Sequence, residues 1–318
     1  MAAEEIHYVY MGDGDPPDDA THVRIHDSVT DISMSLFYEH PNIVELFCPE
    51  NVKEIEGPFC ANCPRLKQVV MLAVEKLEVC TFSYCESLEY VECNHLEDIG
   101  GYAFFKCKSL RGMDLPSARI VGGLTFSECE AMKEVKFGKN LESIEGRAFY
   151  KCPSLERITI PLKNDLFDND NIFQECENLR HVHLVEEEIL HEIVATLHLE
   201  RWRNDMKNII DSIEHFLPLS SPGIWDHNGS DSGGKVIVID HWIRSILRKI
   251  IHYKEQHCQI LKETAIILKS VFPHEIVVNH VLPLLELPSY SFDGEDNDNE
   301  MDNVINDLEM MMMTTAHF

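Results

Sequence analysis

Apolar residues in the first 185 positions recur with a period of 22 to 24 residues, and every period repeats the same five positions. The order is an aromatic residue (replaced by Cys60 in one period), a cysteine three positions later, then leucine or methionine, then a mostly β-branched residue, and finally an apolar residue two positions further on. An earlier copy runs from Phe37 to Cys48, with His40 in the cysteine position. The cysteines of the column are Cys63, Cys85, Cys107, Cys129, Cys152 and Cys176. Such a fixed period predicts a solenoid, because one short unit cannot bury its own apolar side and stacked neighbours can.

The end of each period alternates between apolar and polar residues, which is the pattern of a short β-strand. We therefore predict stacked parallel strands that include residues 67–71, 89–93, 133–137 and 156–160. A second apolar step follows each strand, and a glycine such as Gly57, Gly100, Gly122 or Gly146 comes next. We expect these glycines to supply the backbone conformations of tight corners.

The repeats set the first domain boundaries. A capping half-repeat around Val23 and Ile25 precedes the copy at Phe37. Together these units predict one solenoid over residues 21–185. The acidic segment 1–20 is expected to lie outside it.

After Leu184 the apolar residues step alternately by three and four, which is typical of helices. We predict a first helix within 186–217, a flexible loop at 218–234, and a long helix followed by a short one within 235–290. The two longer helices are expected to fold back as an antiparallel pair. Residues 291–318 hold eight carboxylates and no Lys or Arg, and they lack periodicity. This composition favours a disordered acidic tail.

The long predicted helix carries basic residues at its outer positions, including Arg244, Arg248 and Lys249, whereas the first helix is partly acidic. Charge pairing between the two helices explains this pattern most simply. The alternative is a basic stripe that binds a partner.

The segment IEGRAFYKCPSLERITIP at residues 144–161 resembles the BspA-type leucine-rich repeat, and the likeness covers roughly residues 21–185. The helical sequence at 199–206 and 241–250 is similar to the region after such repeats in a large diatom family. The resemblance implies a recognition surface and carries no catalytic residues over to this chain. The expected fold class is α/β, with a leucine-rich-repeat solenoid of short parallel strands followed by an α-helical hairpin region.

The chain is strongly acidic, with 27 Lys and Arg against 55 Asp and Glu and a formal charge of -28 over 318 residues. This charge repels phosphate backbones and anionic lipid, so we expect neither nucleic acid nor membranes as partners. The first residues lack the basic start and apolar stretch of an export signal. We therefore expect a cytoplasmic protein, with the nucleus as the alternative, whose 11 cysteines are reduced.

Three features suggest chemistry, and each has a simpler explanation. Residues 229–235 match G-x-x-x-x-G-K, but no Ser or Thr follows the lysine, so nucleotide binding is not expected. The cysteine column forms a ladder rather than a converging set of ligands, which favours packing over metal binding. His181 and His183 on one strand face are the weaker hypothesis of a metal- or pH-sensing pair. We predict no enzyme activity, cofactor or bound metal, and expect no small-molecule ligand.

The outward residues of the predicted strands are the remaining candidate site. Phe47, Val70 and Tyr90 are expected to form an exposed apolar cluster, which is typical of protein-binding hot spots. Coverage by the acidic N-terminal segment is the alternative for this cluster. The predicted function is a non-catalytic protein-interaction scaffold. The alternative function is a small-molecule or metal-sensing module that uses loop 218–234 or the histidine pair. The candidate protein-binding residues are Phe47, Val70, Tyr90, Glu92, Asp114, Lys136, Arg157, Thr159 and His183.

Overall fold

The structure is a computed structural model that describes residues 5–30, 32, 34–169, 171–185, 190, 194, 200–213, 217 and 234–269. The chain forms two compact units. The first contains Met1–Pro161, Asp165–Glu186 and Ile213–His241, and the second contains Leu162–Asn164, Glu187–Ser212 and Trp242–Phe318.

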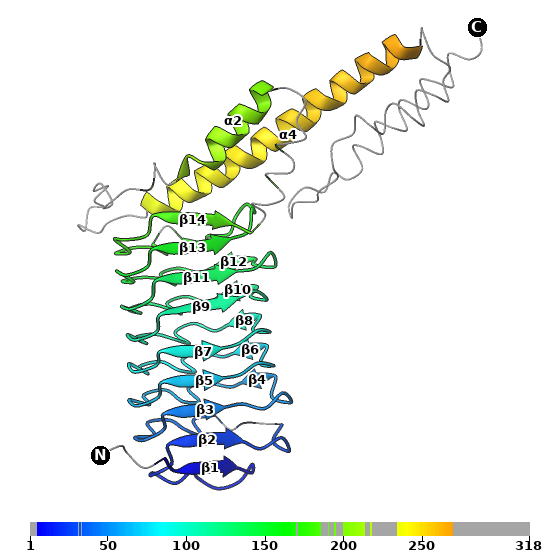
Figure 1. Ribbon diagram of the computed structural model, residues 1–318. Coiled ribbons are helices and arrows are strands. Elements are labelled where there is room, and N and C mark those ends of the chain that lie inside the picture. Colours follow the sequence, from blue (N-terminus) through cyan, green and yellow to red (C-terminus); the bar gives the residue numbers. More distant parts are fainter. Residues whose placement is uncertain are drawn as a thin grey trace. The chain divides into compact units, whose positions relative to one another are not determined.

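The first unit is a solenoid in which parallel strands stack in chain order (Figure 1). Each strand alternates between inner and outer residues, as in the pattern of buried and exposed positions along Glu134–Phe137. One sheet contains β1 (His7–Tyr10), β2 (His22–Ile25), β3 (Glu45–Phe47), β5 (Gln68–Val70) and β7 (Tyr90–Glu92). A second contains β9 (Gly112–Leu115), β11 (Glu134–Phe137), β13 (Arg157–Ile160) and β14 (His181–Leu184). The predicted parallel-strand solenoid is confirmed.

The second apolar step of each period forms a further parallel sheet of two-residue strands. Its apolar residues, such as Ile55 and Val121, are fully buried, while the residues before them are more exposed. The strands are β4 (Glu54–Ile55), β6 (Lys76–Leu77), β8 (Asp98–Ile99), β10 (Ile120–Val121) and β12 (Ser143–Ile144). The two steps of the repeat therefore build two walls around a shared core.

The strand β1 lies in the segment 1–20, which the sequence had placed outside the solenoid. It pairs in parallel with β2, with His7 opposite His22. Tyr10 is buried, and its ring lies 6.2 Å from the ring of Phe37. The solenoid therefore begins before residue 21, and the boundary is corrected. The pattern did not reveal this coil because it lacks the cysteine and leucine positions of the later repeats.

A ladder of phenylalanine rings fills the core, with centroids of neighbouring rings 5.2 to 6.3 Å apart. The sequence places Cys60 where the other periods have an aromatic residue. The structure fills that position with Phe59, whose ring lies between Phe37 and Phe82. The rings of the ladder are Phe37, Phe59, Phe82, Phe104, Phe126, Phe149 and Phe173.

The cysteine column forms a second ladder beside the rings, and every one of its six thiols is buried. Each thiol donates a hydrogen bond to a backbone carbonyl of the preceding coil, at 2.9 to 3.2 Å. His40 takes the same role in the earlier copy, because its Nε2 lies 2.9 Å from the carbonyl oxygen of Pro17. This position of the repeat therefore holds a side chain that donates a hydrogen bond to the neighbouring coil, and both cysteine and histidine can do so.

The corner glycines mainly allow the backbones of neighbouring coils to approach closely. This corrects the expectation that they supply unusual backbone conformations. Of the four, Gly57 alone has a left-handed backbone, with φ of 52°. A Cβ on Gly100 would lie 2.5 Å from the carbonyl carbon of Glu78, and one on Gly122 would lie 2.6 Å from a backbone nitrogen. Left-handed conformations fall instead on other residues, such as Tyr102, with φ of 60°.

The second unit contains α2 and most of α4. The helix α2 spans Glu200–Ile210, within the predicted 186–217, and α4 spans Gly234–Lys269, within one residue of the predicted start. The Trp202 ring stacks on Tyr253 at 5.1 Å, while Trp242 Nε1 donates to the carbonyl oxygen of Ile209 at 2.7 Å. Since later residues of α2 meet earlier residues of α4, the pair is antiparallel, as predicted.

Charge pairing between the helices has one described example. Lys249 Nζ lies 2.7 Å from Asp205 Oδ2, and the Tyr253 hydroxyl also donates to that carboxylate. Residues 218–233 of the predicted loop 218–234, the predicted short helix after 269 and the tail 291–318 lie outside the described residues, and Gly234 begins α4. No helix within the described ranges is both long and apolar enough to cross a membrane.

Candidate functional site

The predicted site residues lie at outer positions of the large strands, and strand pairing joins them into columns. Phe47 pairs with Val70, and Val70 pairs with Glu92. In the second sheet, one column runs through Asp114, Lys136, Thr159 and His183. Tyr90 and Arg157 belong to the neighbouring column, two positions earlier on their strands. We call these outward residues of β3, β5, β7, β9, β11, β13 and β14 the strand face.

The apolar part of the strand face is less uniform than its sequence suggests. Tyr90 is 65% exposed, whereas Phe47 and Val70 are half-buried. The Arg24 guanidinium lies 4.6 Å from the centre of the Phe47 ring and covers it. Tyr90 is therefore the most accessible apolar residue of the predicted cluster.

The charged part of the strand face divides into paired and unpaired groups. Glu134 lies 3.6 Å from the Lys136 ammonium and 3.5 Å from the Arg157 guanidinium, and Glu156 lies 3.8 Å from Arg157, so two carboxylates face the two cations. Glu92 and Asp114 are exposed and, within the part of the chain that the structure describes, form no ion pair. Both carboxylates contribute, after burial itself, to raising the pKa of the nearby Cys93 thiol. Among the described residues, Glu92 and Asp114 thus form an acidic patch without ion pairs near Tyr90, although Lys136 lies opposite Asp114 in the strand pairing.

The two features of the alternative function occupy other places. His181 and His183 are half-buried on β14, and neither belongs to a group of three metal-ligating side chains within the described residues. Lys235, the lysine of the G-x-x-x-x-G-K match, is buried in the first turn of α4. Its ammonium donates to the carbonyl oxygen of Leu179 at 2.8 Å. A phosphate ligand would have to compete with this buried hydrogen bond.

A cluster of aromatic residues at a corner of the solenoid is not among the candidate site residues that the sequence pattern predicts. The Phe105 ring lies 5.3 Å from Tyr84 and 5.4 Å from Tyr102, and both tyrosines are exposed. The Lys106 ammonium lies 5.2 Å from the ring centres of Tyr84 and Phe105. We call Tyr84, Tyr102, Phe105 and Lys106 the aromatic corner. Its signal in the sequence is weak, because the three rings occupy different positions of the repeat.

The chain is similar to a known repeat family and to solved leucine-rich repeat proteins. The BspA type leucine rich repeat region matches residues 19–89 and 97–196, in six copies. A leucine-rich repeat protein from Bacteroides ovatus ATCC 8483 is 27% identical over 45% of this chain and 37% of its own length, with a TM-score of 0.41. A leucine-rich repeat protein of T. pallidum is 23% identical over 56% of this chain and 69% of its own, with a TM-score of 0.36. No curated protein matches the sequence significantly.

The family match covers more than half of the 318 residues and coincides with the coils seen in the structure. The similarity of the helical sequence to diatom proteins remains a prediction. The chain belongs to the family of BspA-type leucine-rich-repeat proteins.

Proposed function

We propose that this chain is a non-catalytic interaction module that binds a protein partner through the strand face, at the part formed by Val70, Tyr90, Glu92 and Asp114. The observation that carries the proposal is the position of the 65% exposed Tyr90 ring beside two exposed carboxylates without ion pairs among the described residues. Exposed tyrosines next to polar groups are frequent energetic centres of protein interfaces. Leucine-rich-repeat proteins generally serve as interaction modules, which supports the same assignment.

The charges and apolar side chains of this surface indicate what kind of partner it binds. Glu92 and Asp114 form no ion pair within the described part of the chain, although Lys136 lies opposite Asp114 in the strand pairing, so a Lys or Arg of the partner would pair with them. Val70 and Tyr90 offer apolar area for a neighbouring side chain. The chain's charge of -28 would also speed the approach of a basic protein at low salt. The partner we propose therefore presents a basic side chain next to an apolar one.

Lys136 and Arg157 have a smaller role in this proposal. Glu134 lies near both, and Glu156 adds a second carboxylate beside Arg157, so their charge is already offset. Thr159 and His183 continue the column toward β14 and would form the rim of the interface. We also place the interaction in the cytoplasm or nucleus, because nine of the ten described cysteines are buried packing residues and a reducing compartment keeps such thiols reduced.

The test is proximity labelling by the full-length chain, followed by titration of the purified partner. Tyr90→Ala and Asp114→Lys should each weaken the interaction, and a hot-spot truncation of about 2 kcal/mol corresponds to roughly 30-fold. The matched control is Tyr84→Ala in the aromatic corner, which removes an equally large exposed ring from another surface. Circular dichroism shows whether each variant keeps the fold.

Two results would contradict the strand face as the binding surface. Loss of the partner in Tyr84→Ala, with Tyr90→Ala unaffected, would move the interface to the aromatic corner. Loss in Arg248→Glu, an exposed position of α4, would make the helical unit the reader and the repeats a platform. A strand-face interaction driven by the acidic patch should also weaken as salt rises.

A further inference from the structure

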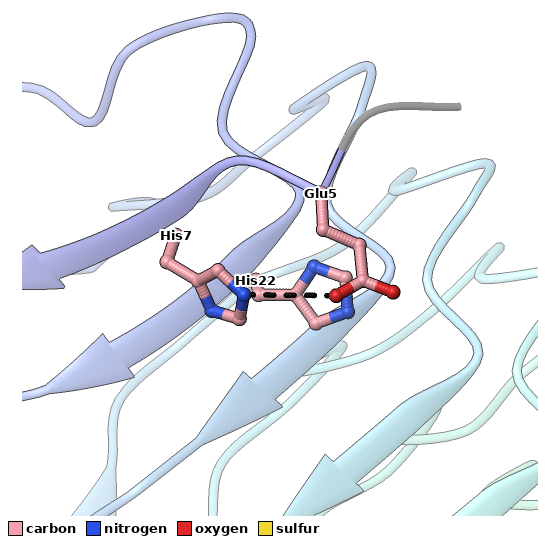
Figure 2. A group of neighbouring side chains, drawn as sticks. All are labelled: Glu5, His7 and His22. Carbon is pink, nitrogen blue, oxygen red and sulfur yellow. Dashed lines mark ion pairs between the residues drawn. The ribbon is translucent and has the colours of Figure 1, made fainter. Parts of the chain in front are cut away.

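We propose that the first two coils of the solenoid hold a Zn²⁺ site formed by Glu5, His7 and His22. One ligand atom from each of these residues lies within 4.8 Å of the other two. Figure 2 shows the Glu5 carboxylate and the two imidazole rings gathered in front of β1 and β2. The site is independent of the proposed partner-binding surface, because it uses none of those residues.

The strand pairing explains how the ligands meet. His7 on β1 lies directly opposite His22 on β2, and their ring centres are 4.8 Å apart. Glu5 precedes β1, and its Oε2 lies 3.7 Å from His7 Nε2. Ligands that bind zinc tetrahedrally at about 2.0–2.1 Å are about 3.3 Å from one another. The side chains therefore need to close by roughly an ångström, and Glu5 and His7 are exposed enough to rotate.

The backbone already holds the three ligands in place. Ile6, which lies between Glu5 and His7, accepts hydrogen bonds at its carbonyl oxygen from the amides of Thr21 and His22 at 2.9 and 3.0 Å. The buried Thr21 hydroxyl accepts from the Ile6 amide at 2.7 Å and donates to the Ile6 carbonyl at 3.1 Å. These contacts fix the segment that carries two ligands against the residue that carries the third.

The same threonine can support a metal-bound histidine. Thr21 Oγ1 lies 2.9 Å from His22 Nδ1. When an ion takes the Nε2 lone pair of His22, Nδ1 carries the ring proton and donates it to Thr21 Oγ1, whose own proton then goes to the Ile6 carbonyl oxygen. A hydrogen bond of this kind behind a ligating histidine is the usual support of a zinc site.

The donor set favours zinc among common ions. Imidazole nitrogen with carboxylate oxygen suits Zn²⁺ and its neighbours in the first transition row, whereas Ca²⁺ and Mg²⁺ prefer oxygen alone. The Glu45 carboxylate lies 3.8 Å from His22 Nε2 and adds a second negative charge beside the ion. The fourth position is left for water. The bound ion would tie the start of the edge strand β1 to β2 and stabilise the terminal coil.

The test is calorimetric titration of the full-length chain with zinc chloride in a phosphine reductant. We expect one site that is lost in His7→Gln and in His22→Gln. Thr21→Val keeps all three ligands and should weaken binding by about 10- to 100-fold. The matched control is the double variant His181→Gln/His183→Gln, which removes two histidines from one strand and should retain the site. Hydrogen exchange should show that zinc slows exchange of the β1 amides in the unmodified chain.

The alternatives give different results. Binding that survives in both His7→Gln and Glu5→Gln, which are exposed positions, would overturn the proposal even if His22→Gln fails to fold. Loss of binding in the His181/His183 double variant would place the metal at β14 instead. Substitution of Zn²⁺ by Co²⁺ reports the donor atoms, and a thiolate charge-transfer band would assign the ion to cysteines and refute the site.

Discussion

Replacing Cys129 tests whether the cysteine column holds neighbouring coils together through hydrogen bonds or only fills space. Cys129 is fully buried, and its thiol donates to the carbonyl oxygen of Phe104 at 3.2 Å. The same oxygen accepts the backbone amide of Cys107, also at 3.2 Å. The Phe104 carbonyl therefore joins two neighbouring coils, and removal of the Cys129 thiol leaves it with one partner.

The two substitutions of Cys129 differ in what they remove. Cys129→Ala loses the buried sulfur, worth about 1–1.5 kcal/mol with the cavity it leaves. It also loses a hydrogen bond of about 0.5–1 kcal/mol, so we expect a total of about 2 kcal/mol. Cys129→Ser keeps a donor, but the shorter C–O bond places the oxygen farther than 3.2 Å from Phe104, where an O–H···O bond is weak. We expect the serine variant to cost about 1–2 kcal/mol.

Which of the two variants is more stable shows whether the thiol acts as a hydrogen-bond donor or only fills space. If the column only packs, alanine is the milder change, because it buries no hydroxyl. If the thiol acts as a donor, serine is as stable as alanine or more so. An alanine variant that is more stable than the serine variant by about 1 kcal/mol would refute the hydrogen-bond reasoning.

The assay is denaturant unfolding of the full-length chain, together with hydrogen exchange of the coil that contains Cys129. The local measurement is needed because coils of a solenoid contact only their neighbours and need not unfold together. Cys80→Ser is the matched control, since Cys80 is partly exposed and lies outside the column. Its effect should stay within about 0.5 kcal/mol.

A glycine, an ion pair and a thiol give three more tests of the same structure. Gly138→Ala should cost about 3 kcal/mol or more in urea unfolding, because its Cβ would lie 1.9 Å from a carbonyl oxygen, whereas Gly146→Ala has 3.4 Å of space and should change little. Lys249 lowers the pKa of the Asp205 carboxyl. This pair therefore stabilises the fold above the usual carboxyl pKa of about 4, and the stabilisation is lost as pH falls through the lower pKa of Asp205 in the folded state. Asp205→Asn should therefore cost about 0.5–1 kcal/mol at pH 7, discounted for exposure, and the difference from wild type should vanish in strong acid. In native-state alkylation with peptide mapping, Cys80 should react first among the ten described cysteines, because the other nine are buried.

The parts of the fold that follow the period could be predicted from the sequence. The alternation in each coil fixes which residues point inward, so β5, β7, β11 and β13 lie where the pattern placed them. The repeat pattern was wrong at one core position, where the side chain comes from the residue next to the one that the pattern assigns. Phe59 fills the ring position that a strict column assigns to Cys60, because the core requires a ring there and not a particular place in the sequence.

The candidate surface could be predicted only in part. Outward positions follow from strand alternation, but their exposure depends on what the adjacent coil presents. Arg24 covers Phe47 because the register of β2 and β3 places them side by side, and no local pattern encodes that pairing. Likewise, Glu134 and Glu156 pair with Lys136 and Arg157, which leaves Glu92 and Asp114 without ion pairs among the described residues. Charge counts along the chain cannot distinguish the charged residues that form ion pairs from those that do not.

The proposed zinc site could not be predicted from the repeat pattern. His7 and His22 are 15 residues apart, which is shorter than any spacing in the cysteine column, so a search at the repeat period does not align them. They become neighbours because β1 and β2 pair, and that pairing needs only the buried side of each strand, such as Val23 and Ile25. Among the described residues β1 is an edge strand, so its outer positions are constrained by a neighbouring coil on one side only. Residues specific to one protein can therefore accumulate there without breaking the repeat, and terminal coils are the first place to search for them in related solenoids.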